Sequence, residues 1–147
     1  MKKNKKDEII GKTEMREIRK METIEMEVSG EKNHLWTLSQ KENCIKQIIS
    51  RERTKEAPLG GHYHKGEDPS KDPEVFGLIK GKMKVTLHNQ KGDSEEFVLE
   101  EGYELRIQPF VHHDFDVIED IVLLECRISL FNIKNQDIYH WPDDLSS

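Results

Sequence analysis

Apolar and polar residues alternate along most of this chain, in short runs separated by turn residues. In residues 82–88 (KMKVTLH), Met83, Val85 and Leu87 occupy every second position. Because successive side chains of a strand point to opposite faces, this pattern predicts a strand with one buried face. Similar runs predict further strands at residues 24–28, 34–38, 44–50, 74–80, 95–100, 103–107, 115–118 and 121–131. Short strands at regular spacing, with no long helix between them, indicate an all-β antiparallel sandwich or barrel.

The first twenty residues depart from this alternation. Met15, Ile18 and Met21 recur at helical spacing, so residues 1–20 are expected to be mobile or helical. This stretch holds eight Lys or Arg and four Asp or Glu. We therefore predict a charged N-terminal extension over residues 1–23 and one folded domain over residues 24–147.

Three further expectations come from the detailed pattern. Gly81 is expected in a turn between two strands, and residues 64–74, which are rich in proline and charge, in an exposed loop. In residues 121–131, the alternate apolar residues Val122, Leu124 and Cys126 should face the core. Glu125 and Arg127 would then lie on the opposite face and form surface salt bridges.

Composition narrows the class of protein. The 147 residues carry a net charge of −6, which argues against general nucleic-acid binding. No apolar run approaches the roughly 18–20 residues that span a bilayer, and no secretory signal follows the basic start. The sequence thus predicts a cytoplasmic protein without a membrane segment. Cys44 and Cys126 are isolated in apolar surroundings, which predicts reduced, buried thiols.

The segment GGHYHK (residues 60–65) contains the clearest candidate chemistry. In a strand, His62 and His64 would point to one face and Tyr63 to the other. Neutral imidazole is a common metal ligand, so two imidazoles on one face can share an ion. A pair of polar histidines on a strand surface is the alternative.

The surrounding spacing resembles the two motifs of the cupin superfamily. The first motif is a glycine-led His-x-His, then Glu, six residues and Gly, and here Glu74 and Gly81 have that spacing. The second is Gly, five residues, a proline turn, two residues and His, which matches Gly102, Pro109 and His113. The resemblance covers about residues 45–130. It implies a double-stranded β-helix, or jelly-roll barrel.

By this resemblance the metal ligands are His62, His64, Glu74 and His113. Nine residues separate His64 from Glu74, so residues 65–73 must be an insertion, and Glu67 is the rival carboxylate. His112 is the rival to His113. The implied cofactor is a divalent ion, and Zn, Fe, Mn and Ni all accept mixed nitrogen and oxygen ligands.

A finer resemblance concerns function. The GGHYHK segment and the tail from Asn132 to Tyr139 look like the cupin domains of capsule and nucleotide-sugar biosynthesis. This implies a metal-binding sugar isomerase or epimerase that moves a proton next to a carbonyl. Without metal, His62 or His64 would be the catalytic base. The alternatives are a metal-dependent oxygenase and a non-catalytic module that binds a sugar or another small molecule. The resemblance also implies a homodimer.

Overall fold

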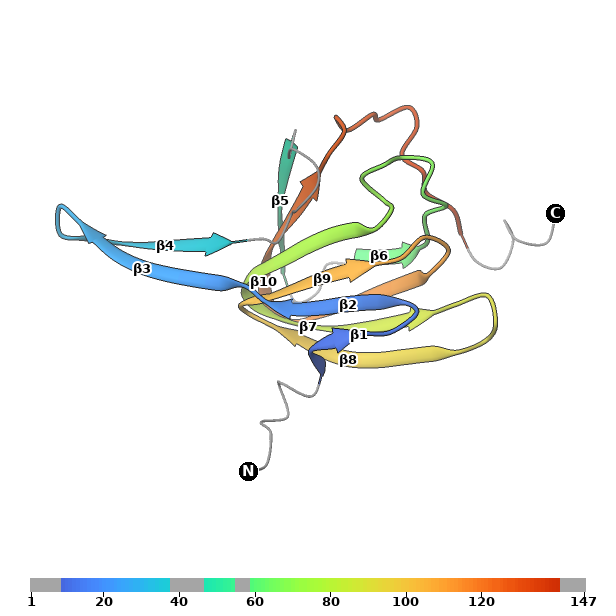
Figure 1. Ribbon diagram of the computed structural model, residues 1–147, viewed down its shortest axis with the longest axis horizontal. Helices are drawn as coiled ribbons and strands as arrows, with labels where there is room; N and C mark the ends of the chain where they lie inside the picture. The colour runs from blue at the N-terminus through green and yellow to red at the C-terminus, as the bar shows by residue number, and fades with distance from the viewer. Residues whose placement is uncertain (1–8, 38–46, 55–58, 141–147) are drawn as a thin grey trace, which may run out of the picture.

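The structure is a computed structural model that describes residues 9–37, 47–54 and 59–140. Ten strands form its regular structure in these ranges, which confirms the all-β prediction (Figure 1). They are β1 (Gly11–Lys12), β2 (Arg16–Lys20), β3 (Glu22–Val28), β4 (Glu31–Thr37), β5 (Gln47–Arg53), β6 (Leu59–His62), β7 (Glu74–His88), β8 (Ser94–Glu100), β9 (Tyr103–Ile107) and β10 (His112–Arg127). None of the described residues form a helix long and apolar enough to cross a membrane.

Two long strands, β7 and β10, organise the sheet. They pair antiparallel along most of their length, with register shifts between Val117 and Leu123. Before Gly81, β7 pairs with β9, and after it β7 pairs with β8. Likewise β10 pairs first with β6 and then with β5. The two halves of β7 thus pair with different strands of one antiparallel sheet, and so do the two halves of β10.

Gly81 lies within β7 and not in a turn, so the expected pair of strands is one bent strand. Its φ is +88°, a backbone conformation that favours glycine. A Cβ there would lie 2.2 Å from the carbonyl oxygen of Asp120 on β10. The bend therefore requires a residue without a side chain, because β10 passes too close for any other.

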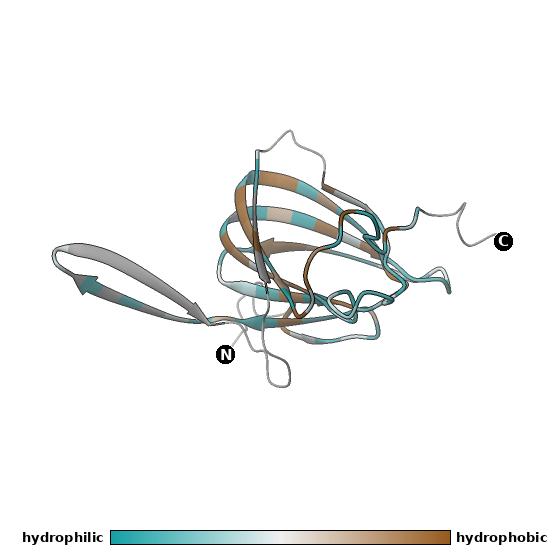
Figure 2. Ribbon diagram, turned by 90° about the horizontal axis from the view of Figure 1, so that it is seen from above, coloured by the Kyte–Doolittle hydropathy of each residue, from teal (hydrophilic) through white to brown (hydrophobic). Residues whose placement is uncertain are grey.

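The apolar residues from both halves of the sheet meet in one core. Met83, Val85 and Leu87 are fully buried, as their alternation predicts. Leu78 and Leu123 join them from the other half. In Figure 2, hydrophobic positions (brown) recur along the curved strands of the main sheet.

The prediction of which face of the last strand is buried is wrong. Ile121 and Leu123 lie in the core, and Glu125 and Arg127 are each only 1% exposed. The alternation of apolar residues predicts the wrong face because charged residues occupy the buried face, where each contacts an opposite charge. Cys126 is a buried free thiol, as expected, and burial raises its pKa to about 11. Cys44 lies outside the described residues.

The expectation of a mobile or helical start is wrong for residues 16–20. They form β2, which pairs with β9, and Ile18 is fully buried. Arg16 fixes this segment, because its side chain contacts Glu95 on β8 and the carbonyls of Ile9 and Gly11. A short strand can share the three-residue spacing of a helix when only a few apolar positions are available. The predicted domain boundary at residue 24 falls inside β3.

β3 and β4 form a separate two-stranded sheet, a hairpin that extends away from the main sheet (Figure 1). The main sheet follows the order β1-β2-β9-β7-β10-β5, with β6 and β8 as side branches. Among the described residues β1 and β5 do not pair, so the sheet is open. Closure into a jelly-roll barrel stays a prediction.

Gly81→Ala tests the bend in β7. The substitution combines a positive φ with a clash against Asp120, and we expect it to lower the free energy of unfolding by about 2–4 kcal/mol. Gly92→Ala is the matched control, since Gly92 also has a positive φ (+91°) but no atom within 4 Å of a Cβ. It should cost only about 1–2 kcal/mol. Urea denaturation measures both, and equal losses would contradict this account.

Candidate functional site

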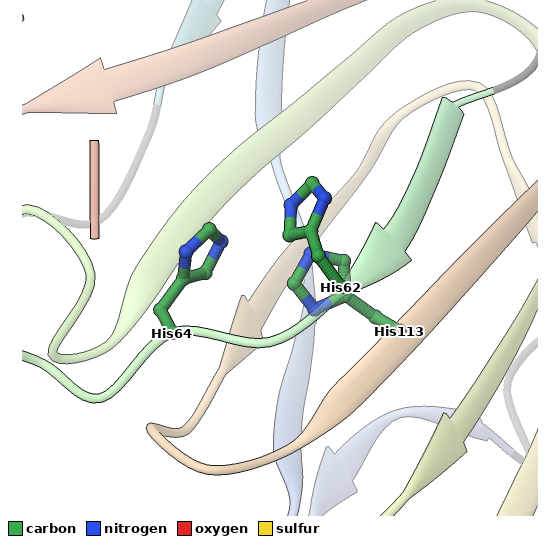
Figure 3. A group of neighbouring side chains, drawn as sticks. All are labelled: His62, His64 and His113. Atoms are coloured by element: carbon green, nitrogen blue, oxygen red, sulfur yellow. The ribbon is translucent and has the colours of Figure 1, made fainter. Parts of the chain in front are cut away.

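Three histidines meet where β6 runs beside β10. His62 ends β6 and is the Cα partner of His113 near the start of β10. This close pairing depends on Gly60, because a Cβ there would lie 2.8 Å from the His113 carbonyl oxygen. His64 follows two residues after His62. Figure 3 shows the three imidazoles turned toward one another, with ring centroids 4.7–5.1 Å apart.

Tyr63, between the two histidines, points away from them. It is fully buried and packs against Tyr139 and Phe110. Its backbone exchanges two hydrogen bonds with Tyr139, which attaches the C-terminal segment to the chain beside the histidines. The His-x-His segment therefore has one face in the site and one face in a structural contact.

Glu74 places a carboxylate beside the histidines. It is the first residue of β7 and is only 2% exposed. Its Oε2 lies 3.2 Å from Nε2 of His64, and its Oε1 lies 3.5 Å from Nε2 of His113. Thus the structure brings together all four residues that the motifs point to, namely His62, His64, Glu74 and His113.

Backbone carbonyls orient two of the rings. Nδ1 of His64 lies 2.7 Å from the carbonyl oxygen of Asp137, and Nδ1 of His113 lies 3.2 Å from that of Val111. A carbonyl can only accept, so each Nδ1 carries the proton and donates it. In the neutral ring, Nε2 then keeps a lone pair that faces Glu74.

Burial keeps two of the imidazoles uncharged. It lowers the pKa of His62 to about 3, and the neighbouring His113 and His64 lower it further. Burial also lowers the pKa of His113 to about 4, although Glu74 opposes the shift. Both rings are therefore neutral at physiological pH and can act as bases or ligands.

The three histidines are close enough together to share a divalent cation, and Glu74 lies beside two of them. One ring nitrogen from each histidine lies within 4.8 Å of the others. Among the described atoms, Nε2 of His64 and Oε1 of Glu74 are buried without a hydrogen-bond partner. Ligands about 2.1 Å from one ion lie roughly 3–3.5 Å apart, and the His–Glu separations of 3.2 and 3.5 Å agree with this.

Lys71 is a member of the site that the sequence patterns did not reveal. Its ammonium contacts Oε2 of Glu74 and lies 2.5 Å from Oε1 of Glu125. Burial lowers the pKa of Lys71, but the two carboxylates outweigh burial and raise it. Lys71 therefore stays protonated. Two features of the sequence could have pointed to Lys71. One is its position three residues before Glu74, and the other is a glutamate within the apolar run of β10.

The segment from residue 64 to 74 is not the exposed loop that its composition predicts. Ser70 and Lys71 are buried, and the Ser70 hydroxyl accepts hydrogen bonds from the Ile128 and Ser129 amides. Asp68 binds the guanidinium of Arg127. The charged side chains find partners inside the protein, so the segment folds against the end of β10.

Asp137 connects this loop to the C-terminal segment. Its carboxylate accepts hydrogen bonds from the backbone amides of Lys65 and Asp68, while its carbonyl holds the ring of His64. Asp137 is 3% exposed and adopts a φ of +51°. One residue thus fixes both the loop and the orientation of a site histidine.

The histidines open into a cavity of ≈ 150 Å³. Its polar walls come from the site residues, and its apolar walls can cover the carbon skeleton of a small ligand. The polar lining is His62, His64, Lys71, Glu74, His113, Glu125 and Gln136, and the apolar lining includes Leu59, Phe76, Phe115, Leu123, Phe131 and Ile138.

The rival ligands lie elsewhere. Glu67 is exposed and accepts a hydrogen bond from the Tyr139 hydroxyl, which raises the pKa of Tyr139 to about 12. His112 is half-buried, and its Nδ1 lies 3.5 Å from the carboxylate of Asp114. Neither belongs to the cluster around Glu74.

No protein-family model matches the sequence, and no curated protein matches it. Solved structures do match. The sugar 3,4-ketoisomerase QdtA from Thermoanaerobacterium thermosaccharolyticum, solved as a histidine-to-asparagine mutant in complex with TDP-4-keto-6-deoxyglucose, is 20% identical with a TM-score of 0.66. The match covers 90% of this chain and 92% of that chain.

Two others extend the comparison. The TDP-quinovose 3,4-ketoisomerase WlaRB from Campylobacter jejuni is 16% identical with a TM-score of 0.67, over 90% of this chain and 97% of that one. The capsular polysaccharide assembling protein CapF from Staphylococcus aureus is 14% identical with a TM-score of 0.55, over 81% of this chain and 32% of that chain. This chain therefore has a fold that sugar ketoisomerases also have.

Proposed function

We propose that this protein is an isomerase or epimerase that moves a proton next to the carbonyl of a keto-sugar. The substrate we propose is a nucleotide-linked sugar, because structural neighbours are TDP-sugar ketoisomerases. The observation that carries the proposal is the set of side chains that line the cavity. It joins neutral imidazoles to a buried carboxylate and a buried ammonium, which are the groups needed to take up, hold and return a proton.

We assign the base to His64. Its Nδ1 proton is committed to the Asp137 carbonyl, so Nε2 is the nitrogen that can accept a proton. Glu74 lies 3.2 Å from that nitrogen and stabilises the imidazolium that forms. With its pKa at about 3, His62 is a weak base, and we assign it to hydrogen bonding with the substrate.

The step balances without an oxidant. His64 removes the proton from the carbon beside the carbonyl, and the electron pair of that C–H bond forms a C=C bond as the carbonyl oxygen becomes an enolate. The enolate oxygen then takes up the proton of the neighbouring hydroxyl, and His64 returns its proton to the former carbonyl carbon, which yields the isomeric ketone. Lys71 is the positive charge in the cavity nearest to Glu74 and can stabilise the enolate oxygen.

A metal-bound form is the second candidate, favoured by the spacing of the ligand atoms. His62, His64 and His113, with Glu74, would hold the ion. The ion would supply a Lewis acid to the sugar carbonyl. In that form the histidines are no longer available as bases, so the two candidates predict opposite responses to chelation.

Solvent exchange tests the assignment of His64. We expect the wild-type protein to incorporate deuterium from D₂O into TDP-4-keto-6-deoxyglucose at the carbon beside the carbonyl, measured by proton NMR. His64→Asn should slow the exchange by about 10²–10⁴-fold, the usual contribution of a general base. His88→Asn is the control, since His88 is exposed at the end of β7. Exchange at the wild-type rate in His64→Asn would contradict the assignment, and no exchange in the wild type would favour a sugar-binding module.

Chelation separates the two candidates. If His64 acts as a free base, exchange should continue at the wild-type rate after the protein is treated with EDTA and its metal content is measured per chain. Loss of exchange on chelation, with recovery on adding Zn²⁺ or Ni²⁺, would instead establish the metal-bound form.

We also propose that the protein forms a homodimer through the β3–β4 hairpin. Among the described residues the hairpin pairs only with itself, and an isolated two-stranded hairpin is marginally stable in water. Its sequence alternates Ile24, Met26 and Val28 with glutamates, and Glu25 and Glu27 are exposed. A second copy of the chain that pairs with this hairpin would give it the neighbours that it lacks among the described residues.

Light scattering coupled to gel filtration tests the dimer. The wild type should elute at twice the chain mass of 17.3 kDa. The double variant Ile24→Asp and Met26→Asp should elute as a monomer, because it replaces two apolar residues of the proposed interface segment with charges. Glu25→Gln is the control and should remain a dimer. A monomeric wild type at micromolar concentration would refute this interface.

A further inference from the structure

Lys71 shares one carboxylate with the histidine cluster. Its ammonium contacts Oε2 of Glu74, and the same oxygen lies 3.2 Å from Nε2 of His64. The side chains of all three residues are less than a tenth exposed. The carboxylate that would be the fourth metal ligand is therefore already bound to a cation of the protein itself.

The charges around Lys71 explain why it is held there. Glu74 and Glu125 are two buried negative charges, and each would be costly to bury without a partner. Arg127 also lies 3.9 Å from Glu125, but its guanidinium binds Asp68, and the ion-pair partners of Glu74 are Lys71 and the two histidines. Lys71 is the only described cation that contacts both Glu74 and Glu125.

This arrangement has a direct consequence for a metal ion. An ion at the three imidazoles would use Glu74, whose Oε1 has no hydrogen-bond partner while Oε2 contacts the ammonium. The ion and the ammonium would therefore share the negative charge of one carboxylate. The two cations would also repel each other across a short distance in a poorly solvated site, where charge interactions are strong.

We propose that Lys71 is a built-in competitor of divalent metal ions for Glu74, and that it keeps His62, His64 and His113 free of tightly bound metal. The effect of Lys71 does not depend on which sugar binds in the cavity or on whether turnover occurs. It also gives a reason why the imidazoles of a metal-capable cluster would stay available for proton transfer.

The test is the affinity of the full chain for Co²⁺, chosen because its visible absorption reports binding and coordination. The chain is treated with EDTA, freed of chelator and titrated with Co²⁺. The main variant is Lys71→Met with Glu125→Gln, which removes one positive and one negative charge and so keeps the net charge of the cluster. We expect this variant to bind Co²⁺ at least 10-fold more tightly than the wild type.

Adding Glu74→Gln identifies the source of the gain. In the Lys71→Met and Glu125→Gln background it should abolish the tighter binding. In the wild-type background it should change Co²⁺ affinity less than 3-fold, because Lys71 already occupies Glu74. His113→Ala should weaken binding in both backgrounds, since the ring is a ligand in each.

Three results would overturn the proposal. The first is equal or weaker Co²⁺ binding by the folded Lys71→Met and Glu125→Gln variant, including no binding by either protein. The second is retention of the tighter binding after Glu74→Gln is added. The third is a loss of affinity in wild-type Glu74→Gln as large as that in His113→Ala, and this result needs no change at Lys71. Circular dichroism and thermal melting establish that each variant is folded.

Discussion

A single buried carboxylate, Glu74, holds the site together. Its two oxygens lie beside His64, His113 and Lys71, so one negative charge connects a proton acceptor, a neutral imidazole and an ammonium. A carboxylate this deeply buried is stable only with compensating partners. These contacts hold the pKa of Glu74 well below its usual value although burial opposes the shift. In the proposed function, the charge of Glu74 and the cation beside it decide whether the cluster works as a metal site or as a free base.

The fold delivers these groups from separate parts of the chain. Glu74 begins β7 and His113 lies near the start of β10, while the glycine at position 60 lets β6 approach β10 closely enough to bring in His62. Asp137 then links the C-terminal segment to the ring of His64 and to the loop that carries Lys71. The long β7–β10 pair sets the positions of the site residues in the fold. The loop and the C-terminal segment set the orientations of their side chains.

The sequence predicts the parts of this structure that follow from local alternation and motif spacing. These parts are the strands, the buried face of Met83, Val85 and Leu87, and the meeting of the four motif residues. Lys71, Glu125 and Arg127 could not be predicted in the same way, because a charged residue is read as exposed unless its partner is known. Lys71 and Glu125 are 54 residues apart in the chain, and Arg127 and Asp68 are 59 residues apart. The sequence also does not predict the bend at Gly81, because the bend depends on the close approach of β10.

We propose that the protein itself supplies the cation beside Glu74 and that the buried rings of His62 and His113 are neutral at physiological pH. The most direct measurement is a pH titration of the histidine side-chain nitrogens by ¹⁵N NMR, on the full chain treated with chelator. The account predicts that His62 and His113 stay neutral on lowering the pH from 8 to 5, because their pKa values lie at about 3 and about 4. It also predicts that His113 keeps its proton on Nδ1. Protonation of either ring with a midpoint near 6.5, the ordinary histidine value, would contradict it.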